Sequence, residues 1–146
     1  MGVSLLTVLW ILHTLYSPGE QTGTKLACPT SVTVTQAVQN APSGWEAVNG
    51  SGAAQLERAA FYLMHPSKGG SLAPDGTKKS KGEERDTWTF VRKPGDEFWL
   101  GCVYQGTTVI LARKLDNKVS RCDVSYELLP SGSRLRLKGI SCKSGP

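Results

Sequence analysis

The clearest hydrophobic pattern in the chain is a strict alternation near the C-terminus. In residues 121–128 (RCDVSYEL) every second residue is apolar, which is typical of a half-buried strand. The segment 134–138 (RLRLK) alternates again after a turn rich in Pro, Ser and Gly. Ile140 and Cys142 have the opposite parity to the leucines of that second segment, which predicts a one-residue bulge at Gly139. The two segments therefore predict an antiparallel β-hairpin.

The register of this hairpin predicts how the four cysteines pair. With a bulge at Gly139, the inward position opposite Cys122 is Cys142. Directly opposed cross-strand Cβ atoms lie about 4.5–5.5 Å apart, so a modest adjustment permits a disulfide. Cys28 and Cys102 then pair by elimination. Two disulfides in a small chain indicate an oxidising compartment.

Shorter runs predict the remaining elements. Alternating or β-branched stretches predict strands at 31–35, 87–91, 97–104 and 107–112. Residues 53–64 (AAQLERAAFYLM) are compatible with either a helix or a strand. Residues 65–86 combine Gly, Pro and mixed charge, which predicts a mobile loop. The predicted fold is mainly β: a small antiparallel meander or sandwich-like domain spanning 28–146 and held by two disulfides.

An apolar run at the N-terminus predicts export. Residues 3–17 carry no charge and are fewer than the roughly 20 that span a bilayer, which suits a secretory signal peptide. We predict a signal peptide over 1–19, with cleavage between 17 and 27 and no stable membrane span afterwards. The expected location is periplasmic or secreted. Lipid attachment at Cys28 is an alternative, although Lys25 occupies a position where lipidation favours an apolar residue. Another alternative is that residues 3–17 form a buried strand or helix of the core.

The amino-acid composition limits the classes of protein to which the chain can belong. The chain has 146 residues, 39% of them hydrophobic, and a formal net charge of +5, which together predict one folded domain and argue against disorder. It contains no Cys-x-x-Cys pair, and beyond the apolar run its one histidine is His65. We therefore expect no metal and no cofactor.

The positive charge is concentrated in the C-terminal part. Residues 113–143 hold eight Lys and Arg against three acids. The period of 2 places Arg134, Arg136 and Lys138 on the outer face of one strand, with Glu127 opposite Arg136. These cations are candidate binding residues for an acidic protein surface or an anionic envelope polymer. The alternative is a solvated face that protects a sheet edge. Nucleic acid is not expected, because export separates the chain from it.

The aromatic residues divide by strand parity. Four of them occupy inward strand positions and are predicted to be core: Trp88, Phe90, Phe98 and Tyr104. Trp99 has the opposite parity to Cys102, so it belongs either to a second apolar layer or to an exposed contact surface. Since exposed Trp often anchors protein interfaces, Trp99 is a further candidate binding residue.

Catalytic residues are poorly supported by the sequence. His65 lies in a Pro-Ser-Lys-Gly-Gly segment without a recognisable nucleophile motif, and the carboxylates of 83–86 are interleaved with Lys and Arg. An envelope hydrolase using Asp86, Glu97 or His65 remains an alternative, but we predict that the protein is not an enzyme.

A set of spaced motifs along the chain carries a family resemblance. They are Ala27-Cys28-Pro29, Pro42-x-Gly44-Trp45, Phe61-Tyr62, Leu72-x-Pro74, Trp88-Thr89-Phe90, Trp99-Leu100-x-Cys102-x-Tyr104, Thr108-x-Ile110-x-x-x-Arg113, Cys122-x-Val124-x-Tyr126 and Cys142. In these positions the chain resembles a family of small exported bacterial proteins with four cysteines, known by a locus tag from an enteric bacterium. The resemblance implies a periplasmic or secreted β-domain and favours a strand at Phe61-Tyr62. It implies no activity.

These observations together favour a small non-enzymatic binding or inhibitory module in the cell envelope. A protein partner is expected, such as a toxin directed at the envelope or a wall-degrading enzyme; this last step rests on analogy of size and compartment. A structural envelope component without a diffusible ligand is the remaining alternative.

Overall fold

The computed structural model describes residues 26–145, and this part of the chain is built from β-strands. One 3-10 turn, η1 (Pro66–Lys68), interrupts them. The strands are β1 (Ser31–Gln36), β2 (Gly50–Leu63), β3 (Ser71–Leu72), β4 (Gly76–Ser80), β5 (Glu83–Thr89), β6 (Phe98–Tyr104), β7 (Ile110–Lys114), β8 (Val119–Leu128) and β9 (Arg134–Ser144). The prediction of a mainly β domain is confirmed. The predicted signal peptide, 1–19, lies outside the described residues, and no helix within 26–145 has the length and hydrophobicity to cross a bilayer.

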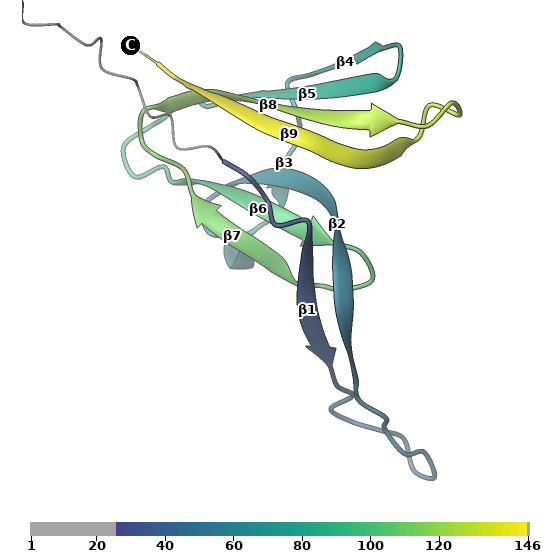
Figure 1. Cartoon of the computed structure of the whole chain (residues 1–146). Helices are drawn as coiled ribbons and strands as arrows, with labels where there is room; N and C mark the ends of the chain where they lie inside the picture. Colours follow the sequence, from purple (N-terminus) through teal and green to yellow (C-terminus); the bar gives the residue numbers. More distant parts are fainter. Residues whose placement is uncertain (1–25, 146) are drawn as a thin grey trace, which may run out of the picture.

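The strands form two antiparallel sheets that pack against each other (Figure 1). One sheet has the order β1-β2-β6-β7, with the short β3 paired to β2. The other has the order β4-β5-β8-β9. The long strand β2 has two roles, because its first half pairs with β1 and its second half pairs with β6 and β3. The first half therefore leaves the sandwich together with β1, as Figure 1 shows.

Aromatic side chains fill the space between the sheets. Phe61 is fully buried, with its ring centroid 4.9 Å from that of Trp88 and 5.3 Å from that of Phe90. Phe90 continues the cluster to Phe98 at 4.8 Å. Rings at these separations and tilts contribute attraction beyond their buried area. The four aromatic residues predicted to be core are all buried, which confirms the parity argument.

The β8–β9 hairpin has the predicted register at its disulfide end. Cys122 pairs with Cys142 and is bonded to it, so this disulfide is confirmed. The bulge lies one residue before its predicted position: Ser125 pairs with Gly139 and Tyr126 with Leu137, which leaves Lys138 rather than Gly139 without a partner. A second irregularity lies closer to the turn, where Glu127 pairs with Arg136 but Leu128 pairs with Arg134. This second shift changes which face the start of β9 presents.

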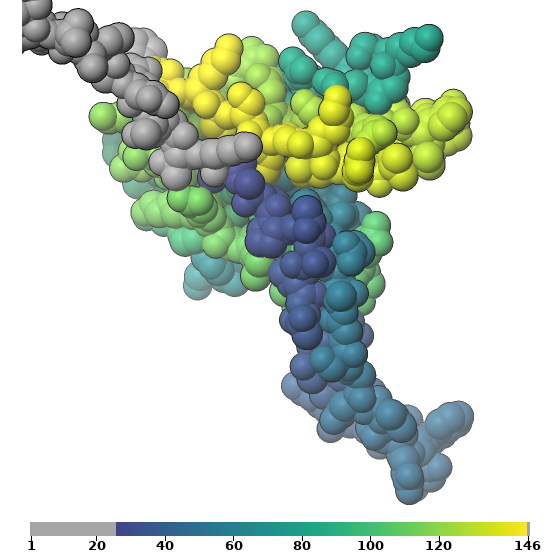
Figure 2. Space-filling view, viewed as in Figure 1, coloured from purple at the N-terminus to yellow at the C-terminus, as the bar shows by residue number. Residues whose placement is uncertain are grey.

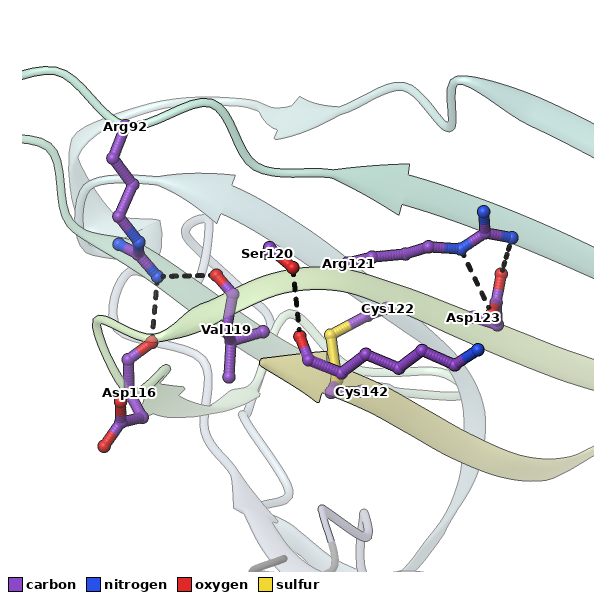
Figure 3. Close-up of a disulfide and its surroundings, with 9 residues drawn as sticks. Arg92, Asp116, Val119, Ser120, Arg121, Cys122, Asp123 and Cys142 are labelled. Carbon is purple, nitrogen blue, oxygen red and sulfur yellow. Dashed lines mark hydrogen bonds and ion pairs between the residues drawn. A yellow bond between two sulfur atoms is a disulfide. The ribbon is translucent and has the colours of Figure 1, made fainter. Parts of the chain in front are cut away.

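Polar contacts surround the disulfide between Cys122 and Cys142 (Figure 3). The Nη2 atom of Arg92 donates to the carbonyl oxygen of Asp116 at 2.9 Å and to that of Val119 at 3.3 Å. Its guanidinium lies 4.9 Å from the centroid of the Phe98 ring. Arg92 therefore ties the segment between β5 and β6 to the turn that leads into β8.

The second predicted disulfide, Cys28–Cys102, is confirmed as well. It joins the segment before β1 to the centre of β6 across 74 residues of sequence. The hydroxyl of Tyr104 donates to the carbonyl oxygen of Pro29 at 3.0 Å, beside this bond. The segment just before β1 is therefore fixed to the core sheet.

The structure resolves one segment that the sequence left ambiguous and corrects the prediction for another. Residues 53–64 form the main part of β2, so the ambiguity between helix and strand is resolved in favour of the strand. Residues 65–86 were expected to be one loop, but residues 76–80 and the start of β5 form a β-hairpin around Gly82. The period of 2 is hidden there because the inward positions hold Glu84 and Asp86 rather than apolar residues.

Gly101 supports close packing on the outer face of the β2–β6–β7 sheet. A Cβ atom added at this position would lie 2.6 Å from Cε2 of Tyr62 and 2.9 Å from Cγ2 of Ile110. We expect Gly101→Ala to lower the free energy of unfolding by about 1–2 kcal/mol, because overpacking forces neighbouring side chains to shift. Urea denaturation measures the loss. Gly139→Ala is the control, since a Cβ there has open space; equal effects of the two variants would contradict the packing argument.

Candidate functional site

The cations predicted on the outer face of β9 are engaged in ion pairs. Nε of Arg136 lies 2.6 Å from Oε2 of Glu127, as the predicted register required. Nζ of Lys138 lies 2.6 Å from Oε2 of Glu83 on β5. A hydrogen bond from Lys138 is the main cause that lowers the pKa of Glu83. These two cations remain accessible, but each of them already has a carboxylate partner.

Arg134 does not share their face, which corrects the prediction of a single strip. The irregularity at Leu128 shifts the start of β9 by one residue, and a shift of one residue turns a side chain to the opposite face of the sheet. The guanidinium of Arg134 therefore lies 4.0 Å from the centroid of the Tyr126 ring, on the core side. There its Nε donates to Oε1 of Glu84 at 2.6 Å and its Nη2 lies 2.5 Å from Oδ2 of Asp86.

Arg134, Glu84 and Asp86 form a largely buried ionic cluster at the rim of the sandwich. Both carboxylates are buried, with 5% and 3% of their surface exposed. Lys79 reaches Glu84 at 2.9 Å from β4, and the hydroxyl of Thr77 donates to Asp86 at 2.6 Å. Buried charges persist only when they are paired and hydrogen-bonded, and each member of this cluster meets that condition. The cluster therefore holds β4 and β9 onto β5.

The cluster makes the stability of the fold dependent on pH. A hydrogen bond from Lys79, opposed by burial and assisted by Arg134, lowers the pKa of Glu84 below its usual value of 4.5. The ionised carboxylate thus stabilises the fold above pH 4.5, and this contribution is lost as the pH falls through the lowered pKa. We expect the free energy of unfolding, measured in urea between pH 7 and pH 3, to fall less steeply in Glu84→Gln than in the parent. Glu46→Gln, which removes an exposed carboxylate, is expected to follow the parent curve.

Trp99 lies on the outer face of the first sheet, in the second apolar layer that its parity allowed. It pairs with Tyr62 across β2 and β6 and is half-buried. The imidazole of His65 packs edge-on against its indole, with ring centroids 4.8 Å apart. Trp99 is thus a packed residue of this layer rather than a fully exposed anchor.

The residues considered for hydrolysis lie in separate environments. Asp86 belongs to the ionic cluster between the sheets, whereas His65 and Glu97 are next to Trp99 on the outer face of the other sheet. The Nδ1 atom of His65 accepts a hydrogen bond from the backbone N–H of Ser67 and caps η1. Glu97 is paired with Lys114, whose hydrogen bond lowers the pKa of the carboxyl group. The structure does not bring these three residues together.

The most exposed apolar feature is one that the strand patterns did not reveal. β1 and the first half of β2 form a two-stranded arm that projects from the sandwich, and residues 37–49 form its tip (Figure 2). Trp45 at the tip has 75% of its surface exposed, and Val48 has 90%. A tight turn precedes Trp45, with its N–H bonded to the carbonyl oxygen of Pro42 and Gly44 at a φ of +85°. Exposed tryptophan on a projection is typical of a protein-binding surface.

The arm is fixed to the sandwich at both ends of its ladder. Gln36 at the end of β1 donates from Nε2 to the carbonyl oxygen of Gly106 at 3.0 Å. The backbone N–H of Leu56 donates to the carbonyl oxygen of Thr30 at 2.8 Å, where the arm joins the body. The disulfide at Cys28 lies immediately before this point. The arm is therefore a braced projection, and its direction is set by the core sheet.

Comparison with known proteins gives this fold a family. Residues 50–143 match the model of the family described as Type VI secretion system Tli immunity protein. The chain belongs to this immunity family. The matched residues begin at the first residue of β2 and therefore contain the sandwich strands from β2 onward but not β1 or the tip of the arm.

A relative of the immunity protein is present in Azospirillum brasilense. It is described as an uncharacterized 16.3 kDa protein in the trpG 5′ region and is 32% identical over 128 residues, which cover 82% of this chain and 83% of the relative. No solved structure matches the chain.

Family membership identifies the class of function. An immunity protein binds and inhibits a toxin, so the prediction of a small inhibitory binding module with a protein partner is confirmed. The resemblance noted in the sequence implied no activity, whereas the family match indicates the inhibition of a toxin. The two disulfides fit an oxidising compartment.

Proposed function

We propose that this chain is a periplasmic immunity protein that neutralises a type VI secretion toxin by forming a one-to-one complex with it. The observation that carries the proposal is the match of residues 50–143 to the immunity family. Inhibition by stable binding requires a rigid surface rather than a reactive centre. The doubly disulfide-bonded sandwich with a braced arm provides such a surface.

The periplasmic location is supported by two independent features. The disulfides join Cys28 to Cys102 and Cys122 to Cys142, and such bonds persist outside the reducing cytosol. The apolar run at residues 3–17 has the length of a signal peptide. An immunity protein in this compartment would meet a toxin at the site where the toxin acts.

The stoichiometry of inhibition distinguishes a binding inhibitor from a catalytic inactivator. A binding inhibitor removes one toxin molecule for each inhibitor molecule, whereas a catalytic inactivator would act at a small fraction of an equivalent. We expect the activity of the purified cognate type VI secretion toxin to fall linearly and to vanish at about one equivalent of the protein. Complete inactivation at a few hundredths of an equivalent would contradict the proposal, and so would residual full activity at a tenfold excess.

A protection assay tests the location in the cell. The same toxin is directed to the periplasm of a susceptible strain that expresses either the full chain or a variant without residues 1–19. We expect growth only with the full chain, together with recovery of the protein in the periplasmic fraction with both disulfides formed. Protection by the cytosolic variant would contradict a periplasmic site of action.

A further inference from the structure

We propose that the tip of the arm, residues 37–49, selects the toxin by inserting Trp45 into an uncharged recess on the toxin surface. This inference rests on the proposed function and names the part of the molecule that performs the recognition. Four features of the arm carry it: exposed apolar side chains, near-absence of charge, a rigid base and a position outside the matched region.

The first feature is apolar surface that has no partner within the protein. Trp45, Val48 and Val38 expose 75%, 90% and 56% of their surfaces. All three are at the end of the projection, where Figure 2 shows the tip clear of the sandwich. An indole offers a large rigid contact area at a small cost in side-chain entropy, which is why Trp is enriched among the residues that dominate interface energies. A projecting tip fits a concave surface on its partner.

The second feature defines the chemistry of that concave surface. Glu46 is the one charged residue between Pro29 and Gln55, although the chain as a whole has a formal net charge of +5. A recess lined with charges would lose hydration on contact with this tip and gain no ion pairs in return. The complementary recess is therefore apolar and uncharged, and binding should depend weakly on salt.

The third feature is that the two strands carrying the tip are held in position before it binds. The six residues of β1 all pair with β2, and Gln36 bonds to the β6–β7 turn at the outer end of this ladder, next to the tip. The Cys28–Cys102 disulfide fixes the inner end of the arm to β6. A braced arm loses little freedom on binding, so more of the contact energy is retained as affinity.

The fourth feature connects the tip with selectivity. The family match covers residues 50–143, which include the sandwich but not residues 37–49. The aromatic core that defines the sandwich lies on β2, β5, β6, β8 and the segment after β5, away from the tip. The tip lies apart from this core, so a change in its contact residues alters the binding surface without disturbing the packing between the sheets.

The affinity test uses Trp45→Ala with the purified cognate type VI secretion toxin as the probe. We expect the Kd to rise at least 100-fold, whereas Val91→Ala leaves it within threefold. Val91 is the matched control, because it is an apolar residue of the body with 79% of its surface exposed. Both variants should keep the parental melting temperature, since neither residue is packed. We expect the Kd of the parent to change less than fivefold between 0.05 and 0.5 M NaCl.

The outcomes separate this inference from the proposed function. Failure of the parent protein to bind the toxin would overturn the proposed function and the inference with it. Binding by the parent that Trp45→Ala leaves unchanged would overturn the inference alone. A large loss of affinity in the double variant R136E/K138E, together with steep salt dependence, would assign recognition to the outer face of β9 and would also overturn it.

A graft tests selectivity directly. Residues 37–49 replace the corresponding loop of the Azospirillum brasilense relative, which is 32% identical to this chain. We expect the grafted relative to bind the toxin of the present chain at least tenfold more tightly than the unmodified relative does. Equal binding by the two proteins would show that the tip does not determine which toxin is chosen.

Discussion

Replacing Cys28 and Cys102 together with alanine is expected to lower the free energy of unfolding by about 4 kcal/mol. The disulfide closes a loop across 74 residues, and in the chain-entropy model a loop of this size restricts the unfolded chain by roughly that amount. Removing Cys122 and Cys142 in the same way should cost about 3 kcal/mol, because their separation is 20 residues. Urea denaturation of the oxidised parent and of the two double variants measures both losses.

The order of these two losses is the informative part. The chain-entropy argument predicts that the longer loop matters more. A larger loss in the C122A/C142A variant would show that local strain or packing around the β8–β9 hairpin outweighs the restriction of the unfolded chain. The C28A/C102A variant should also loosen the base of the arm, which hydrogen exchange at residues 31–36 would detect as faster exchange.

Replacing Arg134 with methionine is expected to lower the free energy of unfolding by about 2–3 kcal/mol. The guanidinium contacts both Glu84 and Asp86, so its removal leaves two buried carboxylates with fewer partners. Breaking a buried ion pair from one side costs about 3–5 kcal/mol, and we take a smaller value because Arg134 is itself partly exposed. Thermal and urea unfolding at pH 7 measure the change.

Arg136→Met is the matched control for this prediction. Arg136 is on the same strand and pairs with Glu127, but its side chain is 73% exposed. Exposed pairs contribute about 0–1 kcal/mol, so this variant should stay close to the parent. The triple variant R134M/E84Q/D86N removes the charges from both sides and should recover part of the loss. Equal effects of R134M and R136M would contradict the assignment of Arg134 to the buried cluster.

The sequence allowed the β8–β9 hairpin and both disulfides to be predicted because a period of 2 is sensitive to a single inserted residue. Once Gly139 was assigned to a bulge, the inward positions placed Cys122 opposite Cys142, and the structure has that pairing. The predicted face of Arg134 was wrong for the same reason, because one further unpaired residue reverses the faces of the residues beyond it. This second irregularity leaves Leu135 without a partner, and a leucine gives no sign of a bulge in the sequence as a glycine does.

Two other features were missed because their causes are tertiary. The hairpin of β4 and β5 presents Glu84 and Asp86 to the interior, and these charges are acceptable only because Arg134, about 50 residues later in the chain, neutralises them. The arm was missed because Trp45 is flanked by turn residues that indicate a loop but not how far the loop projects. No local sequence feature distinguishes a loop that folds back onto the sandwich from one that projects away from it.

The continuity of β2 has a consequence for how this scaffold can diversify. The strand begins at Gly50, at the outer end of the arm, and reaches the fully buried Phe61 without a break. Insertions or replacements between Gln36 and Gly50 thus occur beyond the last ladder pair of the arm. Doubling the length of a flexible loop costs only about 0.6 kcal/mol in closure entropy. New recognition loops can therefore arise on this stalk by duplication or recombination, with little penalty for folding.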